Sequence, residues 1–283
     1  KYILDLIDER ADTYYSKRVV VFSAGQRGAG PGAKKVTCLM RGRRKIHIGT
    51  SGWHYDHWYG AFYPEGLPKE SFLSHYGEHF KTVEINNSFY RLPEKKTLEA
   101  WRKTVPAGFV FTVKGSRYIT HMKKLKDAED ALSALLERIQ ILGEKLGPVL
   151  FQLPPRWTFN PRRLESFLER LPVEGRFAFE FRDPSWHDRV ACELLKNYNA
   201  AFCIYDLAGR QSPREVTADF VYVRLHGPGD AYRGKYGASA LSGWAGAFST
   251  WAAQGKEIFC YFDNDEAGYA VENALSLQAM VSR

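Results

Sequence analysis

Short hydrophobic runs with the composition of β-strands alternate with amphipathic, helix-like segments along most of the chain. The β-like runs are residues 46–51, 82–86, 109–114, 148–153, 176–182, 201–206, 220–227 and 257–265. Helix-like segments lie at 127–147, where Gly147 is predicted to end the helix, and at 161–172, 187–199, 242–255 and 267–281. Eight alternations of strand and helix predict a single-domain α/β protein with a TIM (β/α)8 barrel. A doubly wound open sheet is the alternative, but the Gly-rich first turn typical of that fold is absent.

Within the predicted strands, bulky apolar residues alternate with polar ones. In 176–182 the phenylalanines share one face, while Glu180 and Arg182 share the other. In 220–227 the valines and the leucine oppose Arg224 and His226. The apolar face suits packing against surrounding helices, so the polar face is expected to point into the barrel. The polar residues also concentrate at the carboxyl ends of the strands, where TIM-barrel active sites lie.

We call this end of the predicted barrel the mouth. The candidate residues at the mouth are Glu84, Asn86, Lys114, Gln152, Glu180, Arg182, Arg224, His226 and Asp263. The parity of the last strand is ambiguous, so Asn264 is the alternative to Asp263. Glu180, His226 and Glu84 are the residue types that perform acid/base catalysis. Lys114, Arg182 and Arg224 suit an anionic ligand such as a phosphate or carboxylate; their pairing with the glutamates in a purely structural network is the alternative.

Aromatic side chains follow the same strand ends. The candidate ligand contacts among them are Trp53, Tyr55, Tyr90, Trp186 and Tyr232, with Arg91 and His121 as polar neighbours. Aromatic faces stack on sugars or bases, whereas simple roofing of the barrel core is the alternative. The remaining candidate histidines are expected at the surface or against helices, and they are His54, His57, His75, His79 and His187.

A metal centre at the mouth is the less favoured alternative, and no cofactor is predicted. A metal cluster in a barrel needs several His and carboxylate ligands at neighbouring strand ends. Here His226, Glu180, Glu84 and Asp263 qualify, and they share the mouth with arginines and a lysine.

Net charge and apolar run length limit the partners that the sequence supports. The chain carries +8, but residues 1–45 hold eleven Lys/Arg and four Asp/Glu, whereas the rest holds 29 and 28. The basic character therefore belongs to the N-terminal segment and does not indicate that the main domain binds a polyanion. No apolar run reaches about 18 residues, so no membrane span is expected. The four cysteines are widely spaced without a CxxC pair, which fits a reducing compartment and a cytoplasmic protein.

Residues 1–45 differ from the remainder in composition. They contain an acidic start, the Gly-rich "GQRGAGPG" and the basic "RGRRK". The Gly-rich stretch lacks the GK[ST] of a phosphate loop, so we expect an atypical, flexible extension followed by a domain at 46–283. Met40 stands six residues before the first predicted strand and is expected to be the natural start.

Seven motifs along the chain resemble one known family. They are "GTSGWHYDHWYGAFYP", "VEINNSFYRLP", "FTVKGSRYITH", "GPVLFQLPP", "FEFRDPSW", "VRLHG" and "YFDNDEAGYAVENA". In this order they resemble the YecE-like family, a TIM-barrel family (domain of unknown function 72) with no established reaction. The last strand of that family usually reads FNND, so Asp263 stands where the family has Asn, and residues 1–39 have no counterpart.

The sequence therefore predicts an acid/base enzyme, a hydrolase or isomerase, acting on an anionic substrate that is phosphorylated or sugar-like. TIM barrels support many chemistries, so this expectation depends on the mouth residues and not on the fold. A nucleic-acid-binding or phosphodiester-processing barrel with an aromatic rim is one alternative, and a non-catalytic binding protein is another. The oligomeric state is not predicted.

Overall fold

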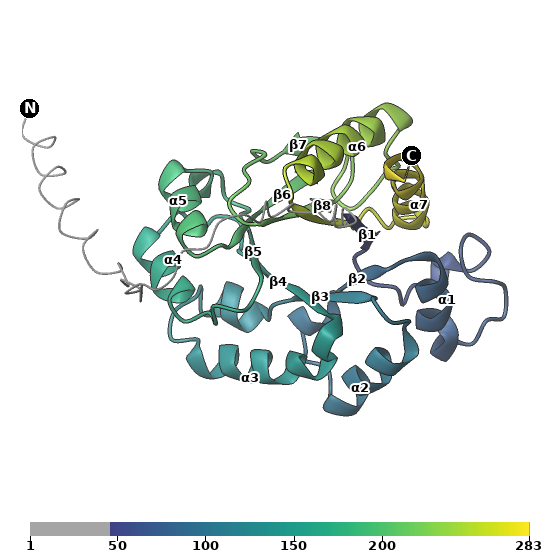
Figure 1. Ribbon diagram of the computed structural model, residues 1–283, viewed down its shortest axis with the longest axis horizontal. Helices are drawn as coiled ribbons and strands as arrows, with labels where there is room; N and C mark the ends of the chain where they lie inside the picture. The colour runs from purple at the N-terminus through teal and green to yellow at the C-terminus, as the bar shows by residue number, and fades with distance from the viewer. Residues whose placement is uncertain (1–45, 283) are drawn as a thin grey trace, which may run out of the picture. The chain divides into compact units, whose positions relative to one another are not determined.

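The computed structural model describes residues 46–282, and a ring of parallel strands forms its centre (Figure 1). The parallel strands are β1 (Ile46–Thr50), β2 (Thr82–Ile85), β3 (Val110–Lys114), β4 (Leu146–Gln152), β5 (Phe177–Glu180), β6 (Ala201–Leu207), β8 (Phe220–Leu225) and β9 (Glu257–Phe262). They pair in the order β1-β9-β8-β6-β5-β4-β3-β2. A parallel bridge between Ser51 and Glu84 joins the two ends of this order, which closes the barrel. The short strand β7 (Arg210–Gln211) pairs antiparallel with β6. All eight predicted strands are confirmed.

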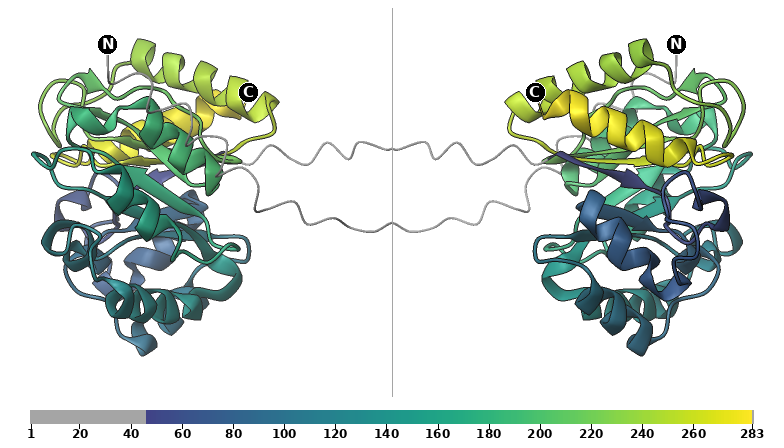
Figure 2. Two further views of the ribbon diagram at one scale, coloured as in Figure 1. Left: turned by 90° about the vertical axis from the view of Figure 1, so that its left-hand side faces the viewer. Right: turned by 90° about the vertical axis from the view of Figure 1, so that its right-hand side faces the viewer.

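Helices follow the strands and pack around the barrel. They are α1 (Phe72–His79), α2 (Lys95–Thr104), α3 (Glu129–Ile139), α4 (Pro161–Leu168), α5 (Arg189–Asn197), α6 (Ala238–Ala253) and α7 (Tyr269–Val281). Short 3-10 segments are η1 (Asp56–Trp58), η2 (Lys69–Ser71), η3 (Asn87–Phe89), η5 (Gln140–Lys145) and η6 (Pro184–Trp186), and η4 (Tyr118–Met122) is a π-helical turn. Figure 2 shows α6 and α7 side by side over the strands. The barrel is therefore flanked by helices, as the alternating pattern predicts, except that β6 is followed by β7 and then β8 with no α-helix between them.

One predicted helix end is wrong. The helix predicted over 127–147 ends at Ile139, and Gly147 lies inside β4. The turn before that strand is made by Gly143, whose φ of 57° lies in the left-handed region that glycine adopts without steric cost. A Cβ on Gly147 would lie 2.5 Å from Val110, so this glycine permits close packing of β4 on β3.

The two faces of the strands are filled as the alternation predicts. Phe177, Phe179 and Phe181 belong to the core cluster between the barrel and its helices. A second cluster fills the interior of the barrel and includes Leu150, Ala178, Cys203, Phe220, Tyr222, Phe259 and Tyr261. Because Phe259 and Tyr261 point inward on β9, the next inward position is Asp263 and not Asn264.

Some predictions concern parts of the chain outside this barrel. The predictions for residues 1–45, including the flexible extension and Met40 as the start, lie outside the described residues. Cys192, Cys203 and Cys260 are buried and free of disulfides. No helix within residues 46–282 is long and apolar enough to cross a membrane.

Candidate functional site

Arg224 is the centre of a buried charged network at the mouth. It projects from β8, is fully buried, and donates from Nε to both carboxylate oxygens of Glu84 at 3.1 Å. Its Nη1 donates to Glu180 at 2.9 Å, and its Nη2 donates to Ser51 and Asp263 at 3.0 Å. The guanidinium is thus bound by the protein on every side. For Arg224, the structural-network alternative describes the contacts better than the predicted anion contact does.

The two predicted catalytic glutamates are also fully buried in this network. Glu84 accepts further hydrogen bonds from Tyr222 at 2.7 Å and from Ser51. Burial alone would raise the pKa of Glu180, but Arg182 and Arg224 outweigh burial and hold that pKa well below its ordinary range. Both glutamates are therefore placed to orient the guanidiniums rather than to contact a ligand.

His226 connects the network to Asp263. Its Nε2 lies 3.1 Å from Nη2 of Arg182 and 3.3 Å from Nη1 of Arg224, and its Nδ1 lies 3.0 Å from Oδ2 of Asp263. Since guanidinium N–H groups face Nε2, the tautomer with its proton on Nδ1 satisfies all these contacts and donates to Asp263. The imidazole is fully buried, and the ring of Tyr232 packs edge-on against it at 5.4 Å. His226 can thus act on a ligand only through Asp263.

A cavity of about 790 Å³ opens at the mouth. Seven of its lining residues are predicted candidates, namely Trp53, Tyr55, Asn86, Tyr90, Lys114, Tyr232 and Asp263. Five further lining residues are not among the predicted ligand contacts, and they are Gly52, His54, Asn87, Thr97 and Trp101. The volume lies in the range of about 300–1,000 Å³ that is typical of small-molecule sites. His54 is exposed, as predicted for a surface residue, and it also lines the cavity.

One wall of the cavity is aromatic. The rings of Trp53 and Trp101 meet edge-to-face at 4.9 Å, and His54 lies 4.4 Å from Trp53. Trp101 comes from α2, whose sequence "KKTLEAWRKT" contains a tryptophan among charged residues. A single tryptophan on an otherwise polar helix is the sequence feature from which Trp101 could have been predicted as a cavity residue. Asn86 donates to Ser51 at 2.7 Å, and its amide oxygen has no hydrogen-bond partner within residues 46–282.

Lys114 differs from the other cations of the mouth. It is half-buried at the end of β3, and its Nζ lies 4.6 Å above the ring of Phe89. Within residues 46–282, this Nζ forms no ion pair or hydrogen bond. Burial, followed by the charge of Arg224, lowers the pKa of Lys114, although the nearby carboxylates oppose the shift. Lys114 thus offers the cavity an amine that no protein carboxylate occupies.

Asp263 is the network carboxylate that lines the cavity. Burial opposes its ionisation, but Arg224 and His226 outweigh that effect and lower the pKa of Asp263. The carboxylate is therefore held in its charged form with its orientation fixed from behind. It can accept hydrogen bonds from ligand hydroxyl groups.

Two predicted ligand contacts lie away from the cavity. Trp186 is fully buried outside the barrel, where it stacks on Phe181 at 4.9 Å and donates from Nε1 to the carbonyl of Trp157. Asn264 donates to Gly234 at 2.8 Å and to Asn273 at 3.0 Å. Both predictions are corrected. Trp186 packs in the outer core, and Asn264 holds the loop that contains Gly234 by a hydrogen bond.

Three further candidates border the mouth without lining the cavity. Gln152 is half-buried at the end of β4, opposite Glu180 in the strand register. His121 packs edge-on against Phe89 at 5.1 Å, and burial with the charge of Lys114 lowers the pKa of His121. Arg91 is exposed and lies outside the set of cavity-lining residues.

The mouth residues that could bind a metal are already paired with other groups. Glu84 and Glu180 bind guanidiniums, and Asp263 binds both Arg224 and His226. Metal binding at this place would have to displace arginine from these carboxylates. The arrangement therefore favours acid/base and hydrogen-bonding chemistry by the side chains themselves.

Comparison with known proteins places the chain in a family. The model of a family described as "Protein of unknown function DUF72" matches residues 47–283. The chain belongs to the DUF72 family. UPF0759 protein YecE of Escherichia coli K12 is 31% identical over 144 residues, which is 50% of this chain and 50% of YecE. UPF0759 protein YunF of Bacillus subtilis 168 is 25% identical over 262 residues, which is 81% of this chain and 92% of YunF.

A solved structure supports the same fold. A DUF72 family protein of Thermotoga maritima MSB8 superposes with a TM-score of 0.77 and 28% sequence identity, covering 84% of this chain and all of that chain. The TIM-like barrel and the family predicted from the motifs are thus confirmed. The match to YecE spans about half of the length of that relative.

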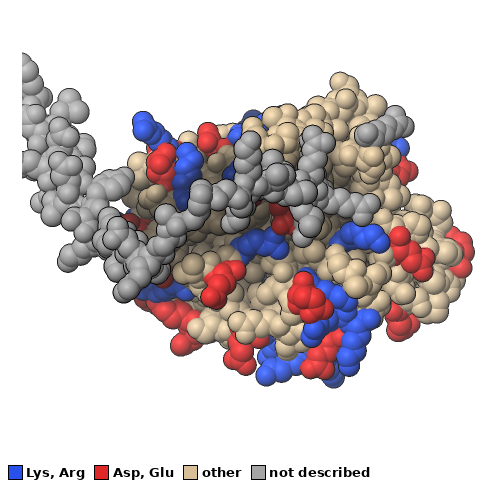
Figure 3. All heavy atoms as spheres, in the orientation of Figure 1, with Lys and Arg blue, Asp and Glu red and all other residues tan. Residues whose placement is uncertain are grey.

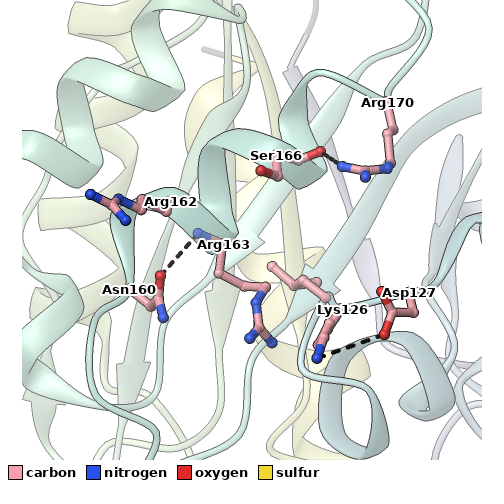
Figure 4. A pocket seen from close by; sticks show the side chains of 8 residues that line it. Lys126, Asp127, Asn160, Arg162, Arg163, Ser166 and Arg170 are labelled. Carbon is pink, nitrogen blue, oxygen red and sulfur yellow. Dashed lines mark hydrogen bonds and ion pairs between the residues drawn. The ribbon is translucent and has the colours of Figure 1, made fainter.

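This DUF72 chain has a second cavity, of about 350 Å³, between the segment before α3 and helix α4 (Figure 4). Lys126, Arg162, Arg163 and Arg170 line it, against the single carboxylate of Asp127. Much of this charge is engaged, since Arg170 pairs with Glu129 at 2.6 Å and Arg163 donates to the carbonyl of Lys124 at 3.1 Å. The sequence signal for this cavity is the helical spacing of arginines in "PRRLESFLER".

Proposed function

We propose that this protein is a small-molecule enzyme of the isomerase type that acts on a sugar-like substrate in the mouth cavity. Lys114 would transfer the proton, and Asp263 would hold a substrate hydroxyl. The observation that carries the proposal is the position of Lys114, which lines the cavity without an ion-pair partner among the described residues. An amine with a lowered pKa is a better base near neutral pH than an ordinary lysine.

The composition of the cavity supports a polyhydroxylated substrate. Trp101 and Tyr55 offer apolar faces for C–H groups, with Trp53 buried behind them, while Asp263 and Asn86 offer acceptors for hydroxyl groups. Such a division between an apolar wall and a few polar groups is typical of small-molecule sites.

The charge balance of the mouth limits how anionic the substrate can be. The carboxylates of Glu84, Glu180 and Asp263 outnumber the guanidiniums of Arg182 and Arg224. Lys114 is then the cation available to a ligand. This favours a sugar-like molecule with a single carbonyl, carboxylate or phosphate group near Lys114 over a polyanion.

Proton transfer next to a carbonyl group fits these side chains better than hydrolysis. Lys114 can remove a proton from carbon in its neutral form and can stabilise an enolate oxygen in its charged form. Asp263 has a lowered pKa and is therefore a weak base, so its role is to orient the substrate. His226 and Arg224 are positioning residues that act through Asp263.

A solvent-exchange assay tests the proposal. The full chain is incubated in D2O with a panel of aldoses, ketoses, sugar acids and sugar phosphates, and exchange of the proton next to the carbonyl group is followed by NMR. We expect exchange with at least one panel member and a loss of about 100-fold or more in Lys114→Met, since acid/base catalysis contributes about 10²–10⁴-fold. Lys81→Met is the matched control, because Lys81 is exposed just before β2, at the opposite end of the barrel. Absence of exchange across the panel, or an unchanged rate in Lys114→Met, would contradict the proposal.

The basic cavity beside α4 favours nucleic-acid binding as the second candidate function. Four cations line that cavity, whereas residues 46–283 together hold 29 Lys/Arg and 28 Asp/Glu. On the visible part of the face in Figure 3, cationic and anionic side chains are interspersed, which argues against an extended basic surface there. Fluorescence anisotropy with a short single-stranded oligonucleotide tests this function. Salt-dependent binding that is weakened in Arg162→Gln/Arg163→Gln and unchanged in Arg102→Gln would support it, and no binding at low salt would exclude it.

A further inference from the structure

Helix α1 carries three metal-ligating side chains outside the mouth. His75, Glu78 and His79 lie at spacings of three and four residues, which places them on one face of the helix. One ligand atom from each lies within 4.8 Å of the others. The imidazole centroids are 4.9 Å apart, and Nδ1 of His75 lies 4.0 Å from a carboxylate oxygen of Glu78. Small side-chain rotations would bring all three atoms onto one ion.

A second contact orients His75 for this role. Its Nε2 lies 3.2 Å from the backbone carbonyl of Phe62. Because a carbonyl oxygen can only accept, Nε2 carries the proton in this contact, which leaves the lone pair of the neutral ring on Nδ1, the nitrogen that lies 4.0 Å from Glu78. Metal-binding histidines commonly donate their other ring N–H to a carbonyl or carboxylate in this way.

We propose that His75, Glu78 and His79 bind a divalent transition metal ion, with Zn²⁺ the favoured ion. Two imidazoles and one carboxylate, without a thiolate, are a ligand set that Zn²⁺ accepts, and water completes the coordination at this exposed position. The ligands lie toward the C-terminal end of α1, whose partial negative charge also favours a cation. Within residues 46–282, no other group of three such side chains meets the same distance condition.

The bound ion would stabilise the packing of the segment that follows β1 against helix α1. The ring of Phe62 packs edge-on at 5.2 Å from both imidazoles, and its backbone N–H donates to the carbonyl of Trp58 at 2.8 Å. Trp58 donates to Asp265 at 2.7 Å and packs 5.0 Å from Tyr55, which lines the mouth cavity. The bound metal thus stabilises one wall of the cavity from outside, and this role is independent of the proposed reaction.

Zinc titration of the chelator-treated full chain tests the site. Isothermal titration calorimetry is expected to show one Zn²⁺ bound per chain, and bound Zn²⁺ is expected to raise the unfolding temperature. His79→Ala changes an exposed side chain and should fold normally. It should weaken Zn²⁺ binding more than about tenfold, since even loss of a residue that supports a ligand costs about 10–100-fold. Glu70→Gln, an exposed carboxylate just before α1, is the matched control and should bind Zn²⁺ like the wild type.

Cobalt substitution gives an independent readout. Co²⁺ at this site should show visible absorption bands that His79→Ala and Glu78→Gln each diminish. If the wild type shows no saturable Zn²⁺ binding, the proposal is wrong. It is equally overturned if both His79→Ala and Glu78→Gln bind Zn²⁺ as tightly as the wild type.

Discussion

Nδ1 of His226 lies 3.0 Å from Oδ2 of Asp263, just past the end of β9. Asp263 also accepts from Arg224 at 3.0 Å, and it is the carboxylate of the network that lines the cavity. The buried charges therefore reach a ligand through this carboxylate, and its removal should alter the electrostatics of the cavity.

Asp263→Asn should change the titration of Lys114 while the fold is kept. The amide oxygen of Asn can still accept from His226 and Arg224. The negative charge of Asp263 raises the pKa of Lys114, so its loss should lower that pKa further. In the proposed enzyme, the acid limb of the pH–rate profile should move to lower pH.

Asp265→Asn is the matched control for this prediction. Asp265 lies two residues further along, contacts His57 and Trp58, and is not one of the largest influences on the pKa of Lys114. If the acid limb of the pH–rate profile lies at the same pH in Asp263→Asn and in the wild type, the charge of Asp263 does not affect the pKa of Lys114 as predicted.

Arg224→Met should destabilise the fold strongly. The substitution leaves Glu84 buried without its guanidinium partner and removes one of the two guanidiniums that pair with Glu180, and breaking a buried ion pair in this way costs about 3–5 kcal/mol. Urea unfolding followed by circular dichroism measures the loss. Arg91→Met removes an exposed rim arginine and should change stability by no more than about 0.5 kcal/mol. Equal stability of the two variants would show that the network is not structural.

Acid should destabilise the protein through the same network. The folded-state pKa values of Glu180 and Asp263 are lowered from ordinary values of 4.5 and 3.8. The folded state therefore binds fewer protons than the unfolded state in this range. The stabilisation is fully present above these ordinary values and is lost as the pH falls through the lowered values. Urea midpoints should be constant from neutral pH to about pH 5 and fall below it. If the urea concentration at the unfolding midpoint is the same at a pH below 4 as at neutral pH, the prediction is contradicted.

The alternation of residues was sufficient to predict the barrel and the contents of its mouth. Glu180 with Arg182, and Arg224 with His226, stand two positions apart in their strands, so period two places each pair on one face. Sequence could not predict which charges pair, because the bonds of Arg224 to Glu84 and Asp263 join positions 140 and 39 residues apart. Fully buried pairs cannot contact a ligand, which is why Glu84 and Glu180 change from catalytic to positioning residues.

Loop and helix contributions to the cavity were also hard to predict. Trp53 and Trp186 both follow a strand end, yet Trp53 lines the cavity and Trp186 stacks on Phe181 in the outer core. The path of each loop determines whether its tryptophan lines the cavity or packs in the outer core. That path depends on contacts between residues distant in sequence. Trp101 reaches the cavity from α2 because of that helix's packing, which residue spacing does not specify.

The titration of Lys114 tests the central claim most directly. Lysines of the full chain are reductively methylated with ¹³C, and the Lys114 signal is assigned from its absence in Lys114→Arg. We expect Lys114 to titrate below the ordinary lysine pKa of 10.5, and we expect a bound ligand to perturb its signal. Titration of Lys114 together with the exposed lysines, unaffected by any ligand that binds, would contradict the assignment of this amine as the proton-transferring group of the mouth.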